Sequence, residues 1–411
     1  MSGDMRLPVE LLYGVMKQLG SHVHGRAFLF QAMQVNRTWH EQACRVLWRA
    51  PPVSALASPE LSEYQRKKYA TYIRRLYFAY YEDTILHWTF RNLRFPQLRY
   101  IDIDHTLAEY VPLGMYIQKN LRHLKFRGGT EVEYVVDLMA TGCQKLKSVD
   151  LGFLERCPAR ERLVRLFDDK SLKSVCIFGA EMESLDVDLL AYLARYNSLE
   201  KLKLWATLDA RDFIDTFYYT ANEYLFRNIQ YINLNQIDVS SIPLLVRSVK
   251  PPHDLFQLRL ALEGDSVDPF QYISELKSLQ VLCIEYRGQV QWSNTDILAL
   301  RGLENLVKLR ILRSRSVQSM IDCPQLTDQD FASVFETKPS LRKLIFEVRN
   351  NLTVEAWVSL GKYCPQLKSC KLRGVYDFHR FRPRDEGQND RPHFPQLARL
   401  TLTRLVPPSG E

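Results

Sequence analysis

The sequence lacks the short motifs that mark the common enzyme classes. It contains no GxSxG, no Walker phosphate loop, no GxGxxG and no HExxH, and therefore offers no nucleophile elbow, nucleotide cradle or zinc-protease helix. We expect a non-catalytic protein without a cofactor or metal. The two histidines of HVH at 22–24 have no third ligand nearby in the sequence, and we interpret them as a loop tip.

The chain also lacks CxxC pairs, blocks of five like charges and apolar runs of the ~18–20 residues that cross a bilayer. Most of its eight cysteines lie in apolar segments, which predicts small hydrophobic side chains in a reducing compartment. We therefore expect an intracellular protein, of the cytoplasm or the nucleus, without membrane contact. The net charge of +8 is spread thinly, so a solvated surface is a better explanation than nucleic-acid binding.

What the chain does contain is one recurring motif, L-x-x-L-x-L, in which Ile, Val, Phe or Cys can replace Leu. Thirteen units begin at residues 73, 98, 121, 146, 172, 199, 229, 255, 279, 306, 341, 367 and 397. Twelve steps cover these 324 residues, a mean period of 27, which lies within the ~20–29 residues of leucine-rich repeats. A doubly wound α/β enzyme is the alternative, and the near-constant period argues against it.

Each unit predicts one strand followed by a helical segment. The last two apolar positions of a unit are two residues apart and therefore face the same side of a strand. Apolar spacing between strands is helical at 133–143, 188–196, 331–339 and 356–365, with Asp328 and Thr353 as expected N-caps. We predict an α/β fold, a curved solenoid over 73–406 with a parallel concave sheet and convex helices. Polar segments at 313–327 and 380–393 are expected to be exposed loops, and 407–411 a tail.

The first fifty residues have a different pattern. Residues 7–20, LPVELLYGVMKQLG, predict an amphipathic helix with Pro8 at its first position and Glu10 in its first turn. Two further short helical segments follow at 27–35 and 36–50. Three short helices bury little surface, so such a unit usually needs a partner. We expect residues 1–51 to form this module and 52–72 a linker or helical cap.

These residues resemble an F-box, through LPVELL at 7–12, VNRTW at 35–39 and LW at 47–48. With the repeats behind it, the whole chain is similar to F-box and leucine-rich-repeat proteins, of the diverged fungal kind. The resemblance implies a substrate-recognition subunit of a cullin-RING ubiquitin ligase. Its F-box would bind the ligase adaptor, and the cullin indirectly, while its repeats hold the protein to be ubiquitinated. The alternative is an F-box scaffold or regulatory protein acting outside a ligase.

The resemblance also assigns residues. Those that match the adaptor-binding surface are Leu7, Pro8, Glu10, Leu11, Leu12 and Val15. Those that match the F-box core are Leu19, Val35, Trp39, Leu47 and Trp48.

Outward positions of the strands suggest what the repeats bind. Positions three, five and seven of the thirteen units hold twelve Lys or Arg and five Asp or Glu, and charge on a concave surface focuses a field. We hypothesise an acidic or phosphorylated protein segment as the ligand. The alternative is that the lysines merely keep an open sheet face soluble. The candidate binding residues are Trp205, Tyr231, Arg259, Tyr286, Lys308, Arg310, Lys343, Lys371 and Arg373.

Overall fold

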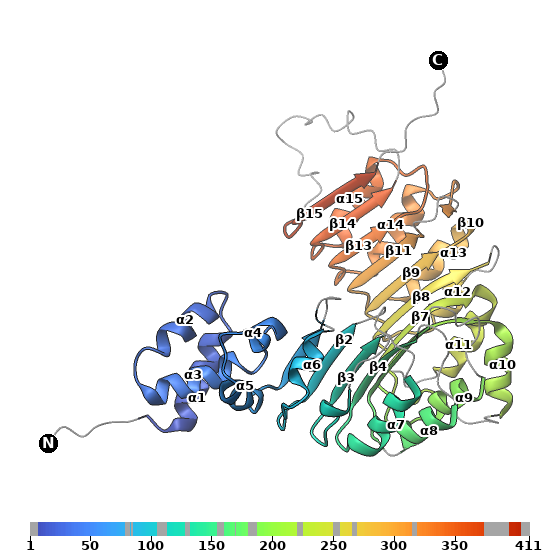
Figure 1. The fold of residues 1–411 in the computed structure, drawn as a ribbon. Helices are drawn as coiled ribbons and strands as arrows, with labels where there is room; N and C mark the ends of the chain where they lie inside the picture. Colours follow the sequence, from blue (N-terminus) through green and yellow to red (C-terminus); the bar gives the residue numbers. More distant parts are fainter. Residues whose placement is uncertain are drawn as a thin grey trace, which may run out of the picture. The chain divides into compact units, whose positions relative to one another are not determined.

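The structure is a computed structural model of the 411-residue chain. It describes residues 7–78, 83, 85–104, 113–127, 132–153, 160–168, 170–179, 187–219, 225–249, 255–264, 269–314, 319–373 and 394–403. These fall into two compact units, Met1–Glu181 and Met182–Glu411, here called the first and second unit (Figure 1).

The first unit begins with helices and continues as a parallel sheet. Its strands pair in chain order: β1 (Arg75–Phe78), β2 (Tyr100–Asp104), β3 (His123–Arg127), β4 (Ser148–Phe153) and β5 (Ser174–Gly179). Its helices are α1 (Val9–Gly20), α2 (Gly25–Ala32), α3 (Arg37–Leu47), α4 (Val53–Ala57), α5 (Glu63–Ala70), α6 (Leu86–Phe90), α7 (Val132–Gly142) and α8 (Arg160–Asp168), with the 3-10 turn η2 (Leu113–Met115).

The second unit repeats the same strand–helix alternation. Its parallel strands, again in chain order, are β6 (Lys201–Leu208), β7 (Tyr231–Asp238), β8 (Gln257–Glu263), β9 (Val281–Tyr286), β11 (Lys308–Arg313), β13 (Lys343–Phe346), β14 (Ser369–Arg373) and β15 (Arg399–Thr403). Its helices are α9 (Val187–Arg195), α10 (Ala210–Tyr219), α11 (Ile242–Ser248), α12 (Pro269–Ile273), α13 (Asn294–Ala299), α14 (Asp328–Glu336) and α15 (Val354–Tyr363). Two 3-10 turns, η3 (Val239–Ser241) and η4 (Leu300–Gly302), complete the helical segments.

The predicted α/β repeat fold is confirmed. Thirteen parallel strands alternate with helices, as in a leucine-rich-repeat solenoid, and every strand begins two residues after the start of a predicted unit. Burial alternates along them, as in β9, where Leu282 and Ile284 are buried while Val281 and Cys283 are partly exposed. One side of each strand therefore faces the core beneath the helices, and we call the other side the open face (Figure 1).

Backbone hydrogen bonds join the chain just before consecutive strands. The carbonyl of Arg74 accepts from the N–H groups of Arg99 and Tyr100, at 2.9 and 3.0 Å. The same arrangement begins one step earlier, where the carbonyl of Arg49, just after α3, accepts from Arg74 and Arg75 at 2.9 and 3.1 Å. The helical segment at the start of the chain is thus hydrogen-bonded to the first repeat.

The helix caps differ in detail from the prediction. Thr353 is the N-cap of α15, as predicted, and its hydroxyl accepts from the Glu355 N–H. The N-cap of α14 is Thr327, which forms a capping box with Asp330. Asp328 instead accepts hydrogen bonds from the N–H and hydroxyl of Thr353, at 2.8 and 2.6 Å. Its carboxylate therefore links the starts of two neighbouring helices.

Three other expectations need comment. Pro8 is the N-cap of α1 rather than its first helical residue. The predicted loop at 313–327 contains a strand, β12 (Met320–Asp322), which pairs in parallel with β10 (Gln289–Gln291), and its Ile321 is fully buried. Residues 315–318, the predicted loop at 380–393, the tail at 407–411 and Cys157 lie outside the described residues.

Lys338 is an ionisable side chain buried inside the second unit. It is fully inaccessible to solvent, and its ammonium donates to the Val334 carbonyl at 2.9 Å and to the Thr337 hydroxyl at 3.0 Å. Burial lowers the pKa of Lys338 from 10.5 to about 8, because the charged form loses hydration that two neutral acceptors do not replace.

We expect this lysine to make stability depend on pH. Between about pH 8 and 10.5 the unfolded chain holds the Lys338 proton and the folded chain has released it, so the free energy of unfolding rises with pH. The rise is on the order of 3 kcal/mol over this window. Below pH 8 both states hold the proton, and the lower stability persists.

Chemical denaturation at a series of pH values checks this. Lys338→Met should flatten the rise between pH 8 and 10.5 relative to the parent chain, while Lys362→Met, at an exposed position of α15, should keep it. The assignment is wrong if both variants follow the parent curve.

Candidate functional site

The three N-terminal helices enclose a small core of their own. Its fully buried members are Leu12, Met16, Leu29, Ala32 and Ala43, and the partly buried side chains packed against them are Leu19, Met33, Trp39, Val46 and Leu47. Helix α3 begins at an Asn36 cap, whose side chain accepts from the Trp39 N–H at 3.0 Å. The module therefore consists of three short helices around one core, and Leu19, Trp39 and Leu47 pack against that core.

Helix α1 presents a second, outward apolar stripe. Leu7, Leu11 and Val15 are 53%, 58% and 44% exposed. Leu11 and Val15 are four residues apart and lie on one side of the helix, and Leu7 lies just before the Pro8 N-cap. The core is already filled by Leu12 and Met16 on the other side of α1. An exposed apolar stripe on a module with its own core has the character of an interface. We call Leu7, Leu11 and Val15 the α1 ridge.

Three assigned residues lie elsewhere than expected. Leu12, assigned to adaptor contact, is only 2% exposed and belongs to the core. Val35, assigned to the core, is 57% exposed because it lies in the turn after α2. Trp48 stacks on Tyr69 of α5, with ring centroids 4.3 Å apart, and so fastens the module to the following helix. Pro8 and Glu10 are exposed beside the ridge.

The sequence analysis missed two exposed aromatic residues on the module. Phe28 and Phe30 of α2 are 41% and 58% exposed. The sequence predicted a short helical segment at 27–35 and assigned no role to either residue. Two aromatic residues two positions apart on a helix cannot both face its core side.

The open face of the second unit gathers positive charge. Register places Lys308 opposite Lys343, and Arg259 and Arg310 on either side of Cys283. Lys201 and Lys203 lie two strands before Arg259 on the same face. We call Lys201, Lys203, Arg259, Lys308, Arg310 and Lys343 the cation cluster. Within the described ranges, none of the six forms an ion pair.

Repulsion within the cation cluster affects its ionisation. Burial, followed by the charges of Arg310, Arg259 and Lys343, lowers the pKa of Lys308. The Arg310 Nε is buried without a hydrogen-bond acceptor among the described residues. An anion placed here would relieve the repulsion and supply an acceptor, since guanidinium groups bind carboxylate and phosphate oxygens strongly.

Aromatic side chains accompany these cations in two different ways. Trp205 on β6 is 36% exposed on the open face, as predicted. Tyr231 also lies on this face, but Lys201, Lys203 and Arg259 cover its ring at 5.8, 5.6 and 5.7 Å from the centroid. Its exposure is only 8%, so it supports the cations rather than serving as an open anchor.

Tyr286 is wrongly placed by the sequence analysis. It is 1% exposed, and its ring meets Trp292 edge to face at 5.5 Å. Tyr286 follows Leu282 and Ile284 at even spacing on β9, so it points into the core with them. Strand parity excludes it from the open face.

Lys371 and Arg373, also predicted to bind substrate, are on the open face but lie next to acids. Lys371 pairs with Glu347, and the carboxylates of Glu347 and Asp322 partly offset the burial and repulsion that lower the pKa of Arg373. These two residues are therefore less available to an external anion than the cation cluster.

The strands of the first unit show the opposite balance. Lys125 pairs with Asp102 at 2.9 Å and Asp104 at 3.1 Å, and Arg127 pairs with Asp150 at 3.3 Å. Three of the five acidic residues at outward strand positions therefore form ion pairs with cations of neighbouring strands. The uncompensated charge of the strands is concentrated in the second unit.

The described part of the chain contains no group of three or more His, Cys, Asp or Glu that could hold a metal ion. No helix in it combines the length and apolar character needed to cross a membrane. The seven described cysteines form no disulfide, and six of them are buried.

Neighbouring leucines on α1 should respond differently to truncation. Leu12→Ala leaves a cavity in the module core and should lower the free energy of unfolding by about 2–5 kcal/mol. Leu11→Ala removes an exposed side chain and should change it by less than about 0.5 kcal/mol. Denaturant unfolding followed by circular dichroism separates the two. Equal losses would show that Leu11 is also buried in solution.

Comparison with known proteins adds little to this description. No family model matches the chain, and no curated protein matches it. One chain in the crystal structure of the Rad7 and Elc1 complex in yeast is similar at 15% identity, over 72% of this chain and 77% of that chain, with a TM-score of 0.37. At that TM-score we base neither the fold nor the function on the likeness; both rest on the repeats and surfaces described above.

Proposed function

We propose that this chain is the substrate-recognition subunit of a cullin-RING ubiquitin ligase, with an F-box at residues 1–51, a helical cap at 52–72 and substrate-binding repeats at 73–406. The observation that carries the proposal is the α1 ridge, which lies outside a core that is already complete. In this role the chain transfers no ubiquitin itself. It acts inside the cell, in the cytoplasm or the nucleus.

Docking follows from the geometry of α1. The α1 ridge is the part of the module that a ligase adaptor would cover, with Pro8 and Glu10 at its margin. Burying the exposed half of these three aliphatic side chains contributes on the order of 1 kcal/mol each, so the ridge can form the centre of an interface with a polar rim. The cullin is reached through the adaptor and needs no contact with this chain.

The second unit supplies the substrate side. We propose that the cation cluster binds an acidic or phosphorylated segment of the protein to be ubiquitinated, with Trp205 as an exposed aromatic anchor. Arg259, Lys308, Arg310 and Lys343 supply two guanidinium and two ammonium groups within one patch of sheet. Clustered cations of this kind are how proteins recognise phosphorylated motifs.

Disruption of the ridge should abolish adaptor and cullin association. Leu11→Asp together with Val15→Asp places two charges in the proposed interface, and both the adaptor and a cullin should be lost from affinity purifications of the tagged chain. Val23→Asp is the matched control, since Val23 is 97% exposed in the loop after α1. Cullin recovery with the double variant would refute the docking surface. Adaptor recovery without a cullin, from the unaltered chain, would favour a scaffold outside a ligase.

Charge reversal in the cation cluster should abolish substrate capture without affecting docking. With ligase turnover blocked, Lys308→Glu/Arg310→Glu/Lys343→Glu should reduce recovery of bound phosphoproteins by about tenfold or more. Arg211→Glu/Arg247→Glu/Lys362→Glu, at exposed helix positions of the same unit, should leave recovery unchanged. Equal recovery by both triple variants would mean that the lysines and arginines only solubilise the open face.

A further inference from the structure

A second basic surface lies in the first unit, along a row of backbone hydrogen bonds. It begins at Arg49, just after α3, and continues through the residues just before β1 to β4, which are Arg74, Arg99, Arg122 and Lys147. The backbone carbonyl of each accepts the N–H of the next at 2.8 to 2.9 Å, and that of Lys147 accepts from Lys173, just before β5. We call Arg49, Arg74, Arg99, Arg122 and Lys147 the basic ladder. Their side chains recur once per strand, so they form a row across the sheet at its strand-start edge.

No carboxylate of the described residues compensates this row. Among the described residues none of the five side chains makes an ion pair, and Arg74 Nε donates to a neutral acceptor, Gln97 Oε1, at 3.3 Å. Burial, then Arg74, Arg122 and Arg49, lower the pKa of Arg99. Burial, followed by Arg122, Arg75 and Lys147, lowers the pKa of His123 next to the row. The surface therefore carries a concentrated positive potential.

The repeat fold does not require cations at this position. In five consecutive repeats of the second unit, the residues just before the strand are Glu200, Gln230, Phe256, Gln280 and Val307. Their backbone bonds are the same as those of the ladder, as between Val307 N–H and the Gln280 carbonyl at 2.8 Å. Since a neutral or acidic side chain serves equally well in the fold, the run of cations in the first unit calls for a ligand.

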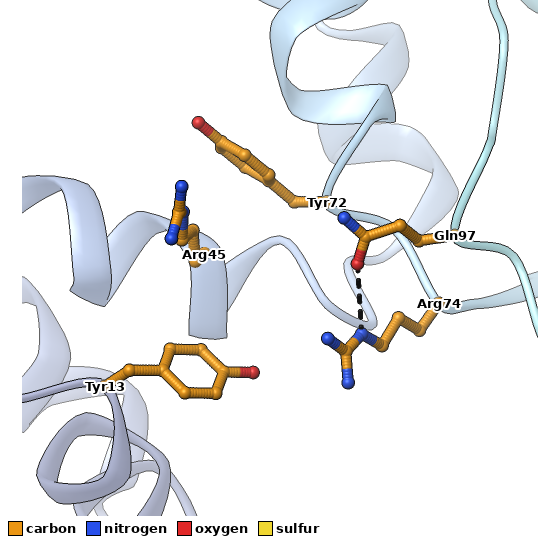
Figure 2. A pocket seen from close by; sticks show the side chains of 5 residues that line it. All are labelled: Tyr13, Arg45, Tyr72, Arg74 and Gln97. Carbon is orange, nitrogen blue, oxygen red and sulfur yellow. Dashed lines mark hydrogen bonds between the residues drawn. The ribbon is translucent and has the colours of Figure 1, made fainter. Parts of the chain in front are cut away.

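A cavity of about 240 Å³ opens at the first rungs of the row. Tyr13, Arg45, Tyr72, Arg74 and Gln97 line it, and Arg45 lies 5.8 Å above the centre of the Tyr72 ring. Figure 2 shows the two guanidinium groups and the Tyr13 hydroxyl around the open space, with Gln97 bonded to Arg74. Each of the five lining side chains carries at least one hydrogen-bond donor, and none is a carboxylate.

We propose that the basic ladder and this cavity bind an acidic α-helix of a partner protein, which lies across the strands. Neighbouring strands are about 4.8 Å apart, so five rungs span about 19 Å. Carboxylates spaced three and four residues apart on a helix advance about 5.3 Å each, or about 21 Å over the same steps. Alternate side chains of an extended peptide would span about 27 Å and lose register.

The chemistry suits carboxylates in particular. A guanidinium presents a planar fork that matches both oxygens of an Asp or Glu side chain, and four of the five rungs are arginines. One acidic side chain enters the cavity between Arg45 and Arg74, and the following ones reach Arg99 and Arg122. This site involves neither the α1 ridge nor the cation cluster, so it does not depend on the ligase role.

The test uses the full-length chain and a fluorescent, capped helical peptide of about 18 residues of Ala, Gln and Glu, with Glu every three and four residues. Fluorescence anisotropy should show binding at least about tenfold tighter than for a peptide of equal composition whose Glu residues are contiguous. Arg99→Gln/Arg122→Gln should lose about tenfold in affinity, and Arg99→Lys/Arg122→Lys should recover part of it. The matched control is Arg342→Gln/Lys368→Gln, at the same repeat position in the second unit, and it should bind normally.

Several results would overturn the proposal. One is equal affinity for the patterned and the contiguous peptide, which would indicate charge attraction alone. Another is an equal loss in the Arg342/Lys368 control. A third is tighter binding of a single-stranded oligonucleotide that depends on Arg99 and Arg122 with a steep salt dependence. Circular dichroism of each variant establishes that it is folded, and the Lys variants keep the charge if the Gln variants are unstable.

Discussion

Parallel pairing of strands too short to stand alone is the constraint on which this molecule depends. From β1 to β14, each strand of the main sheet buries at least two apolar side chains, such as Leu309 and Ile311 of β11. Each also draws hydrogen bonds from its neighbouring strands, as β11 does from β9 and β13. No unit can bury its inner face or satisfy its backbone without neighbours. Packing therefore restricts the inner positions of each strand to apolar residues. The outward positions, and the position just before each strand, can hold many residue types. The charged surfaces of the chain occupy those free positions.

The two units use this freedom differently. In the first, acids and bases of adjacent strands neutralise one another, and positive charge remains just before the strands. In the second, the charge remains on the strands themselves, around Cys283, and residues just before most strands are neutral. Like charges held a few ångströms apart cost free energy, and the hydrophobic core beneath must offset it. The chain thus has two surfaces of the same sign that are built from different repeat positions, as the two proposed anionic ligands require.

Much of this fold could be predicted from the sequence, because the spacing of the apolar residues determines the strands. A motif with apolar residues two apart fixes both the strand and its inner face, so the thirteen strand positions and the outward direction of Lys308 and Arg310 follow directly. Tyr286 lies at even spacing from Leu282 and Ile284 on β9 and points into the core with them, so its assignment to the open face is wrong. On α1 the helical period could not say which of Leu11 and Leu12 faces inward, because that depends on where α2 and α3 pack. The basic ladder from Arg49 to Lys147 was not predicted, because its residues are far apart in the sequence and become neighbours only when consecutive repeats stack.

Arg49 has one more role that concerns the end of the sheet. By accepting from both Arg74 and Arg75, it occupies the place that a preceding repeat would take, and Trp48 holds it there by stacking on Tyr69. The N-terminal helical module is therefore also the terminal cap of the repeats. A repeat array without its terminal cap exposes apolar surface and unpaired backbone. Removing residues 1–51 would remove the proposed adaptor-binding surface and, at the same time, leave β1 with an unpaired edge. A loss of function after that truncation could come either from lost docking or from the uncapped sheet. Single substitutions on the outer side of α1 leave the cap in place and therefore test docking alone.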